Sequence, residues 1–93
     1  MSHFVYMLLS VNKKSFITYI GYSTDPKKRL KDHNDGKGAK FTKGRKWDLI
    51  YFKEYKNKNT ALKEEYRLKK NYNLRKEIKN NYTKNENIST FTI

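Results

Sequence analysis

The sequence has 93 residues and carries 22 Lys and Arg against 9 Asp and Glu, which gives a formal net charge of +13. It contains no Cys and only two His, His3 and His33, which excludes a disulfide scaffold, a thiol nucleophile and a Cys-ligated zinc site. A chain this short with this charge is expected to form one small domain whose partner is a polyanion, nucleic acid before an anionic membrane surface.

A membrane location is not favoured by the hydrophobic pattern. The longest unbroken apolar run, residues 4–9, is far shorter than the roughly 20 residues that a spanning helix needs. No basic region precedes this run, so it does not resemble a secretory signal. We therefore expect a cytoplasmic protein without a membrane partner.

Three segments have the composition of strands. Residues 4–9 and 16–22 are rich in β-branched and aromatic side chains, and each predicts a strand. The polar stretch between them, residues 10–15, is short enough that a hairpin is the simplest connection. A third strand is predicted over residues 48–55, which have an apolar centre.

A helix is predicted to begin at Asp25-Pro26, because Asp can cap a helix and Pro suits the first helical position. This helix carries Arg29 and His33, and it is expected to end before Gly36. A second helix, capped by Asn59 or Thr60, is predicted to run to about residue 71.

The C-terminal part of the chain is less regular in sequence. A weaker helical pattern covers residues 74–82, and residues 83–93 form a polar C-terminal tail. No internal repeat or linker divides the chain. We therefore predict a single α+β domain over residues 1–82.

The segment 36–46 combines positive charge with glycine. It holds five cations, no acid and three of the four glycines, and glycine allows backbone amides to approach a phosphate closely. A solvated, flexible loop is the simplest alternative, but the one-sided charge favours phosphate contact. Phe41 and Trp47 could stack on an unpaired base, although we expect both in the core. The five cations are Lys37, Lys40, Lys43, Arg45 and Lys46.

Arg29 and His33 are spaced i, i+4 and are therefore neighbours on one helical face. Such a pair could hold a phosphate and assist proton transfer. On spacing alone, however, a solvated helix surface is the better explanation.

The helix predicted from residue 60 carries two adjacent glutamates that differ in their position relative to its apolar side. A turn of 100° per residue places Glu65 inside an apolar arc and Glu64 at the edge of that arc. A carboxylate on the core side is costly to desolvate unless a cation compensates it, which either Lys69 or a hard ion such as Mg²⁺ could do. The apolar arc consists of Ala61, Leu62, Tyr66, Leu68 and Tyr72.

An ordered set of motifs resembles the GIY-YIG nuclease superfamily, in the form of its small stand-alone bacterial members. The second motif is intact as Tyr19-Ile20-Gly21, and the first is reduced to Phe4-Val5-Tyr6. The segments 21–34, with its arginine, and 36–42, rich in glycine and lysine, follow in the family's order. Ala61-Leu62-Lys63-Glu64-Glu65 then matches the helix with the metal-binding glutamate.

The resemblance implies a three-stranded antiparallel sheet flanked by helices. It also implies a divalent-metal-dependent endonuclease that hydrolyses DNA phosphodiester bonds, on branched or single-stranded DNA, with one Mg²⁺ or Mn²⁺ and no zinc. By motif position, Tyr6 and Tyr19 would line the cleft, one of them activating or orienting the attacking water. Arg29 would stabilise the charged phosphorane-like state, His33 would assist proton transfer or hold phosphate, and Glu65 would bind the metal.

The partner implied is DNA, with RNA as the alternative. Phosphate contacts are expected from the basic segment, from Lys69 and from the cations that follow it, Lys70, Arg75, Lys76 and Lys79. Two other hypotheses stay open: a non-catalytic nucleic-acid-binding module with the same fold, and a basic scaffold for a larger complex. The nuclease hypothesis expects the five site residues to converge on one exposed cleft, whereas burial of Glu65 in a pair with Lys69 would favour the binding module.

Overall fold

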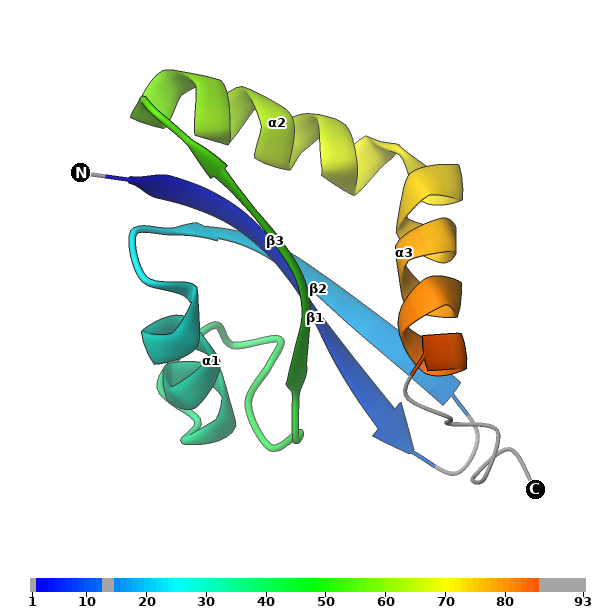
Figure 1. Cartoon of the computed structure of the whole chain (residues 1–93). Coiled ribbons are helices and arrows are strands. Elements are labelled where there is room, and N and C mark those ends of the chain that lie inside the picture. The colour runs from blue at the N-terminus through cyan, green and yellow to red at the C-terminus, as the bar shows by residue number, and fades with distance from the viewer. Residues whose placement is uncertain (1, 13–14, 86–93) are drawn as a thin grey trace.

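The computed structural model describes residues 2–12 and 15–85 and is an α+β fold, as the sequence predicts. Three strands and three helices follow one another in the described part of the chain (Figure 1). Their order is β1 (His3–Asn12), β2 (Ser15–Ser23), α1 (Pro26–Asn34), β3 (Asp48–Tyr55), α2 (Lys58–Lys70) and α3 (Tyr72–Asn85). None of these helices is long and apolar enough to cross a membrane.

The strands form one antiparallel sheet in the order β2-β1-β3, which confirms the three-stranded antiparallel sheet. The central strand β1 has neighbours on both edges and layers on both faces, which explains why every residue from 5 to 9 is buried. The strand predicted over residues 48–55 agrees with β3, while β1 and β2 extend beyond their predicted ends. The predicted connection includes residues 13–14, which lie outside the described residues.

Side chains of the sheet alternate between two apolar clusters, one on each face. On one face, α2 and α3 cover the cluster formed by Val5, Met7, Ile20, Ala61 and Leu68. On the other face, α1 and the segment that follows it cover the cluster formed by Tyr6, Leu8 and Trp47. Figure 1 shows the sheet between α1 on one side and the elbow of α2 and α3 on the other.

The start and end of α1 agree with the prediction. The Asp25 side chain accepts a hydrogen bond from the backbone amide of Lys28 at 3.1 Å, and Pro26 occupies the first helical position. Beyond the end of the helix, Gly36 has a φ of 79°, in the left-handed region that favours glycine.

Two predictions about α2 are wrong. Its cap is Asn57, which accepts from the amide of Thr60 at 2.8 Å, so the helix begins before Asn59 and Thr60. The apolar arc is also narrower than predicted, because only Ala61 and Leu68 of its five members are buried. The sheet covers a limited part of the helix circumference, and the rest of the predicted arc faces solvent.

At the C-terminal end, α3 continues to Asn85, beyond residue 82 where the polar tail was predicted to follow. Residues 86–93 lie outside the described residues. The helix predicted over residues 74–82 is confirmed and is longer at both ends.

Candidate active site

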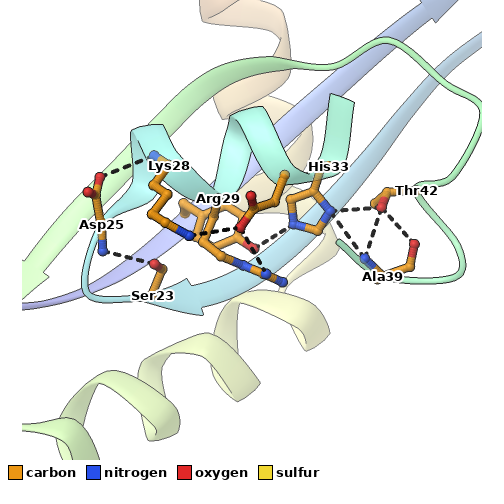
Figure 2. A network of polar contacts seen from close by, with 9 residues as sticks. Ser23, Asp25, Lys28, Arg29, His33, Ala39 and Thr42 are labelled. Carbon is orange, nitrogen blue, oxygen red and sulfur yellow. Dashed lines mark hydrogen bonds and ion pairs between the residues drawn. The ribbon is translucent and has the colours of Figure 1, made fainter. Parts of the chain in front are cut away.

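A chain of buried polar side chains crosses the face of the sheet beneath α1 (Figure 2). The Tyr6 hydroxyl lies 2.9 Å from Nε2 of His33, and Nδ1 of the same ring lies 2.7 Å from Oγ1 of Thr42. Tyr6, His33 and Thr42 are all buried. Hydrogen bonds therefore join β1, α1 and the segment after α1 inside the protein.

Ala39 completes the network around Thr42 and His33. The Thr42 hydroxyl donates to the carbonyl oxygen of Ala39 at 2.9 Å, and the Ala39 amide donates to Oγ1 of Thr42 at 3.2 Å and to Nδ1 of His33 at 3.4 Å. In either neutral tautomer one ring nitrogen of His33 donates and the other accepts, so Tyr6 and Thr42 bond to opposite sides of the ring.

Both rings are neutral near pH 7. Burial lowers the pKa of His33, and the charge of Arg29 lowers it further, while Asp32 acts in the opposite direction. Burial raises the pKa of Tyr6, and Arg29 opposes that rise through a hydrogen bond to the phenol and through its charge. The Tyr6 oxygen thus accepts from Arg29 and bonds to His33 as a phenol rather than a phenolate.

Two glycines make room for these rings. Gly21 is the direct strand partner of Tyr6, and a Cβ at Gly21 would lie 2.3 Å from the Tyr6 hydroxyl oxygen. A Cβ at Gly38 would lie 2.1 Å from Nδ1 of His33. Since both rings are buried and hydrogen-bonded, neither can move away cheaply, and a side chain at either glycine would displace part of the site.

Tyr19 adds a partly exposed ring to the buried pair. Its ring centroid lies 5.0 Å from that of His33 and 6.5 Å from that of Tyr6. Phe41 stacks on Tyr19 with 6.2 Å between ring centroids and an interplanar angle of 20°. The expectation that Phe41 belongs to the core is wrong, because the residue is 56% exposed, whereas Trp47 is buried as predicted.

The basic segment after α1 is anchored at both ends rather than loosely solvated. The Asn34 side chain accepts from the amide of Trp47 at 2.6 Å and donates to its carbonyl at 3.1 Å. The indole N–H of Trp47 donates to the backbone carbonyl of Thr42 at 2.9 Å. Within the described residues, none of its five cations forms an ion pair with a carboxylate; they are Lys37, Lys40, Lys43, Arg45 and Lys46.

Arg29 and His33 lie on the same side of α1, as their spacing predicts (Figure 2). The guanidinium of Arg29 lies 3.6 Å from the carboxylate of Asp32, and its side chain is 35% exposed. Arg29 therefore links the buried Tyr6 to solvent, and part of its guanidinium remains available to an anion.

Glu65, on α2, acts on the Tyr6 site through its charge. Its negative charge contributes to the raised pKa of Tyr6, together with burial and Tyr19. Its side chain is 17% exposed and lies 3.3 Å from the ammonium of Lys69, so the predicted ion pair is formed without complete burial.

Glu64 belongs to a different environment. Its carboxylate pairs with Arg67 at 3.1 Å, and its charge adds to the effect of burial in raising the pKa of Tyr51. The two neighbouring glutamates therefore act on different tyrosines, and it is Glu65 that acts on the Tyr6 site.

Glu65 is also the side chain that could hold a metal in this arrangement. The described residues contain no group of three or more His, Asp or Glu side chains placed to bind an ion. A single carboxylate fits Mg²⁺ or Mn²⁺, whose other ligands would be water and phosphate oxygens, and does not fit a zinc site.

Four of the five predicted residues, Tyr6, Tyr19, Arg29 and His33, come together, but not on an open cleft, and Glu65 acts on Tyr6 through its charge. Tyr6 and His33 are buried, and Tyr19, Arg29 and Glu65 are partly exposed. The expectation of one exposed cleft is therefore wrong for the two buried rings.

Comparison with known proteins identifies the family. Residues 2–84 match the model of the GIY-YIG catalytic domain. The chain belongs to the GIY-YIG family. Among its relatives, the UPF0213 protein YazA of Bacillus subtilis is 42% identical over 78 residues, which cover 83% of this chain and 76% of that protein.

Other small bacterial proteins of the GIY-YIG family are similar. A UPF0213 protein of Bacillus velezensis is 46% identical over 69 residues, which cover 73% of this chain and 67% of that protein. The solution NMR structure of the UPF0213 protein BH0048 from Bacillus halodurans is 38% identical, with a TM-score of 0.44, over 83% of this chain and 80% of that chain. The resemblance seen in the motifs is thereby confirmed.

Three positions of the GIY-YIG site were not identified from sequence: Gly38, Thr42 and Asn34. Thr42 is a polar residue in a basic segment, and nothing in its neighbours indicates that it is buried against His33. The spacing of Asn34 and Trp47 is likewise uninformative, because their hydrogen bonds form only when the intervening segment closes.

Proposed function

We propose that this protein is a divalent-metal-dependent endonuclease that hydrolyses phosphodiester bonds in DNA. The observation that supports it most is that Arg29 and Glu65, from different helices, both act through their charges on the buried Tyr6, which is hydrogen-bonded to His33. A cation, a carboxylate and a hydrogen-bonded phenol at one place are the groups that phosphate hydrolysis requires.

In this proposal Arg29 binds the scissile phosphate and stabilises the charge that develops on it. Glu65 would hold Mg²⁺ or Mn²⁺, which requires its ion pair with Lys69 to open. A bound divalent ion would supply electrostatic stabilisation of the phosphate oxygens. The reaction forms a bond from a water oxygen to phosphorus and breaks the bond to one ester oxygen.

We assign the contact with the attacking water to Tyr19, because Tyr19 is partly exposed whereas Tyr6 is only 1% exposed. Tyr6 and His33 are then positioning residues. Through the Tyr6 oxygen they orient the guanidinium of Arg29, and the ring of His33 packs against that of Tyr19.

The basic segment would bind phosphates on either side of the scissile bond. It begins directly after α1, which carries Arg29, and Phe41 from this segment stacks on Tyr19. Its anchored cations can neutralise phosphates without recognising bases. The cations assigned to this role are Lys37, Lys40, Lys43, Arg45 and Lys46, with Lys69 from α2.

The decisive experiment compares two adjacent glutamates. Purified protein is incubated with single-stranded, flapped, branched and duplex DNA in Mg²⁺ or Mn²⁺, and the products are separated on gels. Glu65→Ala should abolish cleavage and preserve binding, whereas Glu64→Ala should cut like the parent, because Glu64 pairs with Arg67 away from Tyr6. Cleavage by Glu65→Ala at the parent rate would contradict the proposed mechanism.

The ion pair of Glu65 with Lys69 favours one other function, a nucleic-acid-binding module without catalysis. In that case the carboxylate serves only to balance the ammonium. The module predicts salt-dependent binding with no cleavage of any DNA form or RNA in any metal. Metal-dependent cleavage that Glu65→Ala abolishes would exclude it.

A further inference from the structure

The outer surface of the elbow between α2 and α3 carries aromatic rings paired with cations. The ammonium of Lys70 lies 4.5 Å from the ring centroid of Tyr66, within the range of a cation–π contact. The guanidinium of Arg75 lies 5.9 Å from the centroid of Tyr72. This surface belongs to neither apolar cluster of the sheet.

Both tyrosines are exposed far more than a structural role in the elbow would need. Tyr66 is 59% exposed and Tyr72 is 64% exposed, whereas the buried members of α2 are Ala61 and Leu68. Large aromatic surface left in water on a chain with a thin core is costly, and such exposed groups mark binding surfaces.

Tyr72 borders two hollows of this surface. One is lined by Tyr66, Tyr72 and Lys70 among others, and the second, of about 170 Å³, is lined by Phe16, Tyr72, Arg75 and Lys79 among others. Among the described residues, no Asp or Glu lines either hollow. A surface of cations and open rings without acids is complementary to an anion that carries flat groups.

We propose that this elbow binds single-stranded nucleic acid, with unpaired bases stacked on Tyr66 and Tyr72 and phosphates held by Lys70 and Lys79. Arg75 supports the elbow from within, because its guanidinium donates to the carbonyl oxygens of Leu68 and Lys69 at the end of α2. Unpaired bases expose the faces that stack on aromatic rings, whereas the bases of a duplex are already stacked on one another. Nucleic acid is a polyanion that supplies phosphates and planar rings together.

The elbow lies next to the candidate active site along the chain. Tyr66 and Lys70 directly follow Glu65 and Lys69 on α2, which places the two pairs about 100° apart around the helix axis, so the two surfaces are adjacent around its circumference. The inference rests on the proposed function in taking nucleic acid as the ligand. It adds a second surface, which would hold the unpaired strand beyond the scissile phosphate.

The test measures binding separately from cleavage. The affinity of the full chain for a fluorescein-labelled oligothymidylate is measured by anisotropy in EDTA. Replacing both rings, in Tyr66→Ala with Tyr72→Ala, should weaken binding about 25-fold or more, at about fivefold per stacked base. The matched Tyr66→Phe with Tyr72→Phe variant keeps both rings and should bind within about twofold of the parent.

Two further measurements bear on the chemistry of the contact. The alanine variant should bind a blunt duplex of the same length with an affinity within about twofold of that of the parent. Replacing Lys70 and Lys79 with Ala should lower the slope of log affinity against log salt by about 0.7 for each phosphate contact removed.

The outcomes separate this inference from the proposed function. Parent-like affinity of the alanine variant for the oligothymidylate, or an equal loss for the duplex, would overturn the elbow site even if the protein cuts DNA. If the alanine variant loses affinity but the parent cuts no nucleic acid, the elbow site is supported and the proposed nuclease function is excluded. Thermal unfolding followed by circular dichroism should be unchanged in both double variants, since the rings are exposed.

Discussion

The two faces of the sheet place tyrosine side chains in different environments. Beneath α1, the hydroxyl of Tyr6 is buried, and the ring nitrogens of His33 bond to Tyr6 and Thr42. Beneath α2 and α3, the buried cluster is apolar, with half-buried tyrosines packed against it, and on the outer surface Tyr66 and Tyr72 contact cations.

This difference follows from the cost of burying polar groups. Each buried donor or acceptor requires a hydrogen-bond partner, so the side chains beneath α1 can adopt only one arrangement. Side chains fixed in this way can orient a reacting phosphate. An apolar cluster requires only side chains of complementary volume and no polar partners. The outer surface of α2 and α3 can therefore carry exposed rings on which different bases stack. The same residue type, tyrosine, is therefore a fixed positioning group on one face and a stacking platform on the other.

Gly38 tests the rigidity of the α1 face most severely. Gly38→Ala places a Cβ 2.1 Å from the His33 ring, so we expect a loss of about 3 kcal/mol in the free energy of unfolding and loss of cleavage. Urea denaturation and the nuclease assay measure the two effects. The control is Gly44→Ala, where no atom lies within 4 Å and only the φ of 82° opposes a side chain, at about 1 kcal/mol. Equal effects at both glycines would show that His33 is not held tightly.

Tyr6 and Tyr19 separate positioning from contact with water. Tyr6→Phe leaves Nε2 of His33 buried without its hydrogen-bond partner, and should cost about 1–3 kcal/mol of unfolding free energy as well as activity. Tyr19→Phe should abolish cleavage while changing stability by less than about 0.5 kcal/mol, because that residue is partly exposed. Urea midpoints and cleavage rates measured on the same preparations give both quantities. A Tyr19→Phe variant that cuts at the parent rate would exclude Tyr19 from the reaction.

Acid should weaken the α1 face through His33. The pKa of this ring is lowered in the folded protein, so the unfolded chain binds a proton that the folded protein resists. Stability is therefore complete above the unfolded pKa of about 6.5 and is lost as the pH falls from there towards the lowered folded pKa.

The pH effect is measured as urea midpoints between pH 7.5 and 5. His33→Asn should flatten this dependence even though the variant is less stable at every pH, and His3→Gln should retain it. Retention of the full acid loss in His33→Asn would assign the effect to another group.

The smallest expected effect concerns Phe41. Phe41→Leu removes the stacking on Tyr19 and should cost about 0.5–1.5 kcal/mol of unfolding free energy, together with part of the cleavage rate. Phe52→Leu is a matched control for an exposed ring on the same face, since Phe52 is 55% exposed, is the strand partner of Tyr6 and packs edge-on against Phe4. A parallel fall in cleavage in both variants would mean that Phe41 has no role of its own at the site.

The sequence was sufficient for the parts of the fold that depend on local pattern. The strand over residues 48–55 and the helix beginning at Pro26 follow from an apolar run, capping and the fixed φ of proline. The order of the motifs indicated the family, and the spacing from the motif alanine selected Glu65 rather than Glu64. In the structure the charge of Glu65 is one of those that raise the pKa of Tyr6, while its role as a metal ligand stays a prediction.

The parts that depend on contacts across the chain could not be predicted. The cap at Asn57 was missed because Asn59 and Thr60 are equally good capping residues when the sheet is not known. Phe41 was expected in the core because aromatic residues usually are buried, but its place in the core is taken by Trp47. The bond from His33 to Thr42 spans nine positions of irregular chain, for which no periodicity exists.

The paired hydrogen bonds between Asn34 and Trp47 have a consequence for affinity. By joining the end of α1 to the start of β3, they close the basic segment into a loop, and the chain entropy of closure is lost when the protein folds. The protein backbone that carries these cations is therefore ordered before nucleic acid binds. Less loss of chain entropy then opposes binding than for a flexible basic tail of equal charge. The loop therefore gains affinity from folding, and the Asn34 amide contributes to it without touching the ligand.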